Sequence, residues 1–180
     1  MPKLFAVIFA LFLLALPARA APNAVEAILI KQFLVCEGNL AAGCESFGKT
    51  AFSDALIVFT GAVENGSAAA QNNIAMLYET GAGVAQDNVK AAELYHIAAE
   101  AGVSIAQYNL AMLTVTKHVI GEVTDQQERD TDMATAYMWL TFASEKGLKL
   151  AIESRQELIE FMSEGSLKTA KNRLRKRREK

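Results

Sequence analysis

Cys36 and Cys44 are the only cysteines in the chain. In the oxidising compartment implied by the N-terminal segment described below, an isolated pair of cysteines is expected to form a disulfide. This bond would close a short loop between the first two predicted helices and contribute about 2 kcal/mol of stability. Two free thiols, or a metal pair without histidine, are the alternatives. Haem attachment is excluded, because it needs a C-x-x-C-H run that the sequence lacks.

A possible nucleophile, Ser46, lies two residues after Cys44 in the sequence. Ser46-Phe47-Gly48-Lys49 matches the S-x-x-K string of serine β-lactamases, with Lys49-Thr50 and Ser53-Asp54 close by. Enzymes of that class spread three motifs over a large α/β domain so that they converge in space. Here all three fall within ten residues of one predicted helical segment. We interpret the match as accidental and predict no catalytic residue.

Metal and cofactor sites are not indicated. His96 and His118, the only histidines, have no carboxylate or cysteine at ligand spacing. The acidic stretch Asp125 to Asp132 lacks the glycine that an EF-hand requires at its sixth position. Gly81-Ala82-Gly83 has no strand before it and no G-K-[ST] after it, so it reads as a turn between helices rather than a phosphate cradle. Asp87 or Asn88 is suited to begin the next helix.

The N-terminal segment has the organisation of a signal peptide. Lys3 precedes the apolar run Leu4 to Leu16, and Ala18-Arg19-Ala20 provides the small residues of a cleavage site. The run is shorter than the ~20 apolar residues that span a bilayer, although an uncleaved anchor is the alternative. We expect residues 1–20 to be a signal peptide cleaved after Ala20, and the mature chain to be periplasmic or secreted.

Charge is distributed unevenly along the mature chain. Residues 21–167 contain 8 Lys and Arg against 19 Asp and Glu, whereas residues 168–180 contain 8 against 1. The basic tail could form an amphipathic helix through Leu167, Ala170 and Leu174, and contact anionic lipid, lipopolysaccharide or an acidic partner. A solvated, fraying terminus is the alternative. Export argues against a nucleic-acid partner.

The elements that position these residues come from a repeat. Residues 66–77 and 102–113 are identical at seven of twelve positions at a constant offset of 36. A fixed period of this length is typical of stacked-repeat proteins, in which each unit buries its apolar face against its neighbours.

Each repeat predicts a helical hairpin. Gly66, Gly102 and Gly147 are each preceded by apolar residues at i, i+3, i+4 and i+7, the spacing of one helix face. These sets are Ala55, Val58, Phe59, Ala62; Ala91, Leu94, Tyr95, Ala98; and Ala136, Trp139, Leu140, Ala143. Glycine after a helix permits a left-handed turn, and alanine at crossing positions permits close helix packing. We therefore predict an all-α protein built of antiparallel hairpins.

The repeat resembles the Sel-one-like repeat (SLR), a relative of the tetratricopeptide repeat. The residues concerned are Ala-Gln-x-Asn-[Ile/Leu]-Ala-Met-Leu, then Glu79 to Asp87, then a helix ending Ala98-Ala99-Glu100-Ala101-Gly102. The resemblance covers about residues 52–151. It implies a right-handed α-α superhelix that serves as a protein–protein interaction module. Because some cysteine-rich relatives have been described as β-lactamase-like, a small envelope hydrolase is one alternative, and a surface-associating protein using its basic tail is another.

Flanking segments are expected to cap the solenoid. Residues 21–51 would form N-terminal capping helices, beginning with an amphipathic helix at 23–35. Residues 152–180 would form a C-terminal capping helix and the basic tail, with Ser163 as the cap of a last helix.

The second repeat contains extra residues. Leu113 lies 23 positions before Ala136, whereas Leu77 lies 14 before Ala91. Extra residues in a repeat usually map to loops on one face, often the binding face. We interpret residues 114–135 as a specificity loop; a tolerated, solvated insertion is the alternative.

The candidate binding residues lie on the repeat helices by analogy with tetratricopeptide proteins. Their amide, aromatic and thioether side chains would line a concave groove and bind a peptide or protein surface. They are Asn72, Asn73, Met76, Tyr108, Asn109 and Met112. For Asn73 and Asn109 the alternative is a framework role, bonding the adjacent turn. The sequence does not identify the partner.

Overall fold

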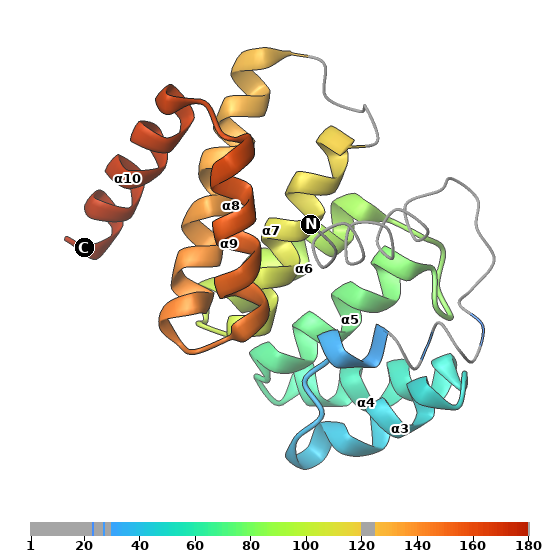
Figure 1. The fold of residues 1–180 in the computed structure, drawn as a ribbon. Helices are drawn as coiled ribbons and strands as arrows, with labels where there is room; N and C mark the ends of the chain where they lie inside the picture. Colours follow the sequence, from blue (N-terminus) through green and yellow to red (C-terminus); the bar gives the residue numbers. More distant parts are fainter. Residues whose placement is uncertain (1–22, 24–26, 28–29, 120–124, 180) are drawn as a thin grey trace. The chain divides into compact units, whose positions relative to one another are not determined.

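The computed structural model describes residues 30–119 and 125–179, together with Asn23 and Ala27. These residues are helical and contain no strand, which confirms the all-α expectation (Figure 1). No helix among them is long and apolar enough to span a membrane. The expected signal peptide, residues 1–20, lies outside the described residues.

The chain divides into two compact units, with the boundary between Ala106 and Gln107. The first unit contains the 3-10 turns η1 (Lys31–Phe33) and η2 (Gly38–Leu40) and the helices α3 (Ala41–Gly48), α4 (Phe52–Glu64), α5 (Ala68–Thr80) and α6 (Asn88–Glu100). The second contains most of α7 (Ser104–Val119) and the helices α8 (Gln126–Glu145), α9 (Lys149–Phe161) and α10 (Glu164–Arg178).

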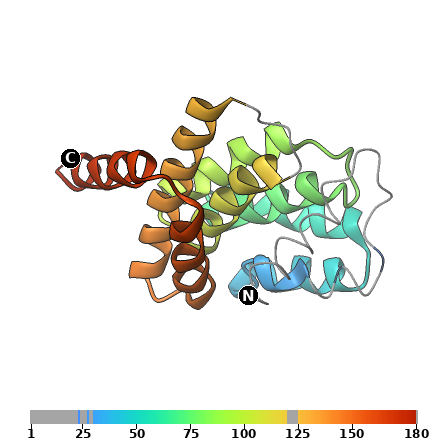
Figure 2. The ribbon, with the colours of Figure 1, turned by 45° about the horizontal axis from the view of Figure 1, so that its top comes forward.

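Within each unit, helices that follow one another in the chain pack in antiparallel pairs, whereas α10 packs parallel to α8. In the first unit α3 packs on α4, α4 on α5, and α5 on α6; in the second, α8 packs on both α9 and α10 (Figures 1 and 2). The helix expected over residues 23–35 ends in the 3-10 turn η1, after which Leu34 is extended, with φ −92° and ψ 152°. The start of that predicted helix lies partly outside the described residues.

The three repeat glycines adopt the predicted left-handed turn. Their φ angles are 82° at Gly66, 86° at Gly102 and 82° at Gly147. In each turn the amide after the glycine donates to the carbonyl of an alanine five residues earlier, the bond that closes a Schellman cap. These bonds are Ser67 N to Ala62 O, Val103 N to Ala98 O, and Leu148 N to Ala143 O, at 3.0–3.2 Å. The repeat period therefore reflects a repeated turn geometry.

The extra residues of the second repeat lengthen its helices. Helices α7 and α8 contain 16 and 20 residues, whereas α5 and α6 contain 13 each. The expectation of a loop over 114–135 is wrong for 114–119, which belong to α7, and for 126–135, which belong to α8. Asp125 caps α8 by accepting a hydrogen bond from the Glu128 amide at 2.8 Å.

The residue sixteen positions before the buried ring of the following helix differs between the first two hairpins; it is Gly43 in one and Glu79 in the other. Gly43 on α3 contacts Phe59 on α4, and a Cβ at Gly43 would lie 2.4 Å from the ring. Sixteen residues also separate Glu79 on α5 from Tyr95 on α6, whose hydroxyl donates to Glu79 Oε2 at 2.7 Å.

The carboxyl group of Glu79 is therefore held inside the first unit. Burial raises the pKa of Glu79 to about 7, against the opposing effect of the Tyr95 hydrogen bond. The corresponding positions of the second repeat are Val115 and Leu140, both buried and apolar. A titratable carboxyl thus replaces glycine or an aliphatic residue in only one of the three hairpins.

Substitution of two helical glycines tests this packing. We expect Gly43→Ala to lower the free energy of unfolding by about 1–3 kcal/mol, since the fully buried Phe59 ring must move. Gly61→Ala, in open space on α4, should raise it by about 0.5–1 kcal/mol. Urea unfolding measures both, and equal effects of the two substitutions would contradict the close contact of α3 and α4.

Glu79 predicts a pH dependence of stability. Because its pKa of about 7 in the folded chain exceeds the ordinary value of 4.5, the free energy of unfolding should fall as pH rises through this interval. The loss amounts to roughly 3 kcal/mol. Glu79→Gln keeps an acceptor for Tyr95 without a charge, so its advantage over the unmodified chain should grow between about pH 5 and about pH 8. Glu64→Gln, at an exposed position of α4, is the matched control. An advantage of Glu79→Gln that is constant with pH would contradict the buried carboxyl.

Candidate functional site

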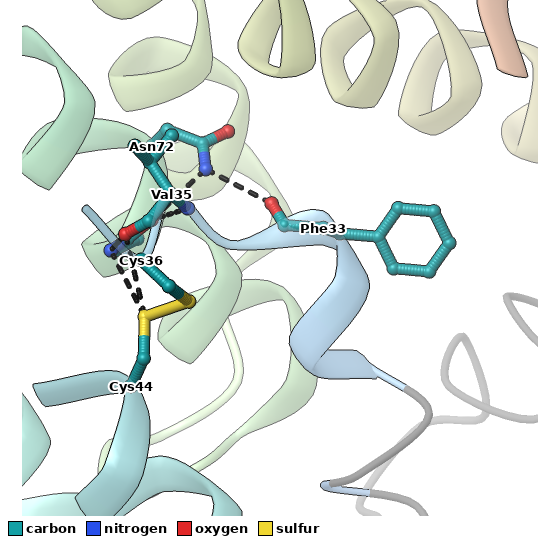
Figure 3. The surroundings of a disulfide bond; sticks show 6 residues. Phe33, Val35, Cys36, Cys44 and Asn72 are labelled. Atoms are coloured by element: carbon teal, nitrogen blue, oxygen red, sulfur yellow. Dashed lines mark hydrogen bonds between the residues drawn. A yellow bond between two sulfur atoms is a disulfide. The ribbon is translucent and has the colours of Figure 1, made fainter. Parts of the chain in front are cut away.

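Cys36 and Cys44 form the predicted disulfide, with their Cα atoms 5.7 Å apart (Figure 3). The bond joins the extended segment after η1 to helix α3. It lies beside the amide side chains of α5, two of the candidate binding residues. The segment that the disulfide attaches to α3 is therefore in contact with the candidate binding residues of α5.

Asn73 binds both backbone groups of one residue of this segment, the amide and the carbonyl of Val35. The amide of Val35 donates to Asn73 Oδ1 at 2.8 Å, and Asn73 Nδ2 donates to the Val35 carbonyl at 2.8 Å. This paired arrangement resembles the bonding of one strand residue to its neighbour in a sheet. The side chain of Asn73 thus takes the place of a partner strand.

Asn72 extends the contact by two residues. Its Nδ2 donates to the Phe33 carbonyl at 3.1 Å and to Asn73 Oδ1 at 3.2 Å (Figure 3). Together the two amides bind backbone groups of Phe33 and Val35. Because the bonds go to backbone atoms, they do not depend on the side chains of Phe33 and Val35.

The structure places all six candidate residues in the interior. Each is at most 4 % exposed, and Asn72 and Asn73 are fully buried. The framework interpretation expected Asn73 to bond the adjacent turn, whereas it bonds a segment 38 residues earlier in the sequence. On α7, Tyr108 and Asn109 occupy the positions equivalent to Asn72 and Asn73 at the repeat offset of 36.

The lengthened part of α7 and α8 brings His118 to an acidic partner. His118 Nε2 lies 3.3 Å from Asp132 Oδ2, and the histidine side chain is 4 % exposed. Burial lowers the pKa of His118, Arg129 acts in the same direction, and the attraction of Asp132 opposes both. The pair fixes the two helix extensions to each other. His96, by contrast, lies on the surface 3.5 Å from Glu100.

The lysine of the S-x-x-K string is engaged with a neighbouring carboxylate. Lys49 Nζ pairs with Glu45 Oε1 at 2.5 Å on the surface, one helical turn away. The Ser46 carbonyl accepts the amides that end α3. Among the described residues, no group of three or more His, Cys, Asp or Glu side chains is placed to hold a metal ion.

Gly81-Ala82-Gly83 forms the turn between α5 and α6, as the sequence predicts. Gly81 and Gly83 have φ of 69° and 74°. Asp87 caps α6 by accepting from the Lys90 amide at 2.9 Å.

Sequence reasoning missed two parts of this region. Phe33 and Val35 were assigned to a helix, and nothing in their side chains signals that their backbone binds the two asparagines. The buried Glu79 was assigned to a turn motif. Its spacing of sixteen from Tyr95, equal to that of Gly43 from Phe59, would have placed it in the hairpin interior.

Comparison with known proteins identifies the repeat. The family model described as the Sel1 repeat matches residues 68–103, 104–116 and 121–148. Comparison with curated protein sequences gives no significant match.

A solved structure shows the same fold. It is the crystal structure of a protective antigen present in uropathogenic Escherichia coli strains, described as displaying an SLR fold. The similarity has a TM-score of 0.57 at 21 % sequence identity, and covers 86 % of this chain and 29 % of the antigen. The chain thus spans less than a third of the length of that structure. Three successive matches to the repeat and the shared fold show that this chain contains Sel1 repeats and has an SLR fold.

Proposed function

We propose that this protein is an exported interaction module that binds an extended segment of a partner protein along its repeat helices. Sel1 repeats indicate a protein–protein interaction module as the general class of function. The signal-peptide pattern of residues 1–20 supports a periplasmic or secreted location.

The observation that carries the proposal is the contact of Asn72 and Asn73 with the segment around Val35. Two adjacent side chains of one repeat helix satisfy three backbone groups of the segment that leaves η1, the Phe33 carbonyl and both groups of Val35. A recognition surface of this kind needs no particular sequence in its ligand, because every extended segment presents the same donors and acceptors.

The equivalent pair on α7 is the place we assign to a partner. Asn109 has the same position in its repeat as Asn73, and Tyr108 replaces Asn72 with a larger aromatic side chain. Met112 follows one turn later and can adapt to apolar side chains of different shapes. Since these three residues are buried, docking exchanges the contacts that now cover α7 for contacts with the partner.

Crosslinking in the cell envelope tests the proposal. At native expression we expect a crosslinked protein partner that is lost, or reduced about tenfold, in Asn109→Ala, because removal of one buried amide contact costs on the order of 1–2 kcal/mol. The exposed Gln127→Ala on α8 is the matched control and should leave the crosslink unchanged.

The export part of the proposal is tested by the mass of the chain recovered from the cell envelope, which should show that its first residue is Ala21.

Two checks separate binding from folding. Helix content and melting temperature should be retained in the variant that loses the partner. Asn109→Gln keeps the amide but displaces it, and should reduce capture in the same direction. A crosslink that survives both Asn109 substitutions would show that the partner docks elsewhere, and the absence of any protein crosslink would contradict an interaction module.

A further inference from the structure

The basic C-terminal segment is a docked helix with two distinct faces. Ser163 caps α10 by accepting from the Ser166 amide at 3.0 Å, as the sequence predicts. Ser166 Oγ donates to the Asp130 carbonyl at 2.9 Å, near the start of α8. Ala170 and Leu174 are buried. The segment therefore does not fray, in contrast to the solvated terminus that the sequence left open.

Three arginines of α10 face α8. Arg173 Nη1 donates to Thr135 Oγ1 at 2.6 Å and to the Thr131 carbonyl at 3.2 Å. The Arg177 guanidinium lies 4.8 Å from the centre of the Trp139 ring, and Arg178 pairs with Glu145. Contacts from Asp130 at one end to Glu145 at the other show that α10 runs parallel to α8 along its length. These three side chains therefore make contacts within the protein.

Four other cations occupy the opposite side of α10. Each is exposed, and none pairs with a carboxylate within the part of the chain that the structure describes. At 100° per residue they fall within one sector, centred opposite Ala170 and Arg177. We call this surface the cationic face; it consists of Lys168, Lys171, Arg175 and Lys176.

The composition of the cationic face determines what it can bind. Its remaining exposed residues carry no apolar side chain and include two carboxylates; they are Glu164, Gly165, Thr169, Asn172 and Glu179. Protein–protein interfaces are built around an apolar or aromatic centre and are depleted in lysine. This face offers no such centre. A planar array of phosphate groups, however, can engage all the cations of a rigid helix at the same time.

We propose that the cationic face of α10 docks the protein on an anionic phospholipid bilayer. The remainder of the mature chain is strongly acidic, with 8 Lys and Arg against 19 Asp and Glu in residues 21–167. Repulsion of that acidic surface orients the protein with α10 toward the bilayer. Docking of this kind leaves α5 and α7 unused and is independent of partner binding.

Vesicle binding by the full chain tests the proposal. The probes are vesicles of phosphatidylcholine alone and of equimolar phosphatidylcholine and phosphatidylglycerol, and the difference between them isolates the contribution of charge. The decisive variant replaces the four lysines and arginines of the cationic face by glutamine. We expect its preference for anionic vesicles to fall at least about a hundredfold, since each basic residue near such a surface contributes about a fivefold gain in binding.

A matched control lowers the net charge by the same four units, but at positions outside α10. It replaces four exposed lysines elsewhere by glutamine: Lys49, Lys90, Lys146 and Lys149. This variant should retain the preference for anionic vesicles to within about tenfold, and raised salt should weaken its binding and that of the unmodified chain alike.

Two results would overturn the proposal. The first is an equal loss of binding in both variants, which would attribute the effect to net charge. The second is unmodified chain that binds both kinds of vesicle equally but binds polyglutamate through the cationic face, which would identify an acidic protein as the occupant. Circular dichroism of each variant checks that α10 remains helical.

Discussion

Alanine side chains at the helix crossings are the constraint on which the rest of this structure depends. Ala55, Ala91 and Ala136 are fully buried and occupy matching positions on α4, α6 and α8, and Ala170 on α10 is also fully buried. A methyl group at each crossing lets the packed helices approach closely, so that little space remains between them. Gly43 shows the limit of this arrangement, because even a methyl group there would overlap the Phe59 ring.

Close packing also explains the specific pairing of two polar side chains of the interior, Asn73 and Glu79. A buried amide or carboxyl without a partner costs more than the hydrogen bond itself is worth. Asn73 therefore binds both backbone groups of Val35, and Glu79 accepts from Tyr95. The same requirement explains why Asn72 and Asn73 of α5 bind the backbone of Phe33 and Val35, which is the property we extend to α7 and its partner. The disulfide then holds the bound segment next to α3.

Sequence reasoning was strongest where a residue type has only a few possible structural roles. Glycine at 66, 102 and 147 predicted left-handed turns, and Ser163 and Asp87 predicted helix caps; the structure contains all of them. The lengthening of the repeat after Leu113 was visible, but a change of period reports only how many residues are added. Whether they extend helices or form a loop depends on tertiary contacts such as that of His118 with Asp132.

The candidate site was less predictable for a physical reason. The repeat predicted that Asn72 and Asn73 line a concave groove, whereas both side chains are fully buried. Their ligand is backbone, however, and backbone carries no signal in the amino-acid sequence. The packing of α10 on α8 could not be predicted for a similar reason. The sequence does not distinguish an arginine that stacks on an aromatic ring, as Arg177 does on Trp139, from an arginine that faces solvent.

Hydrogen exchange at the Val35 amide is the most direct test of the claim that α5 recognises extended backbone. This amide precedes the disulfide, lies in no helix, and has Asn73 Oδ1 as its acceptor at 2.8 Å. We expect the Val35 amide to exchange as slowly as amides in the middle of α5. In Asn73→Ala the Val35 amide should lose this protection, whereas the amides of α5 should remain protected. Rapid exchange at Val35 in the unmodified protein, at the rate of an exposed loop, would contradict the account.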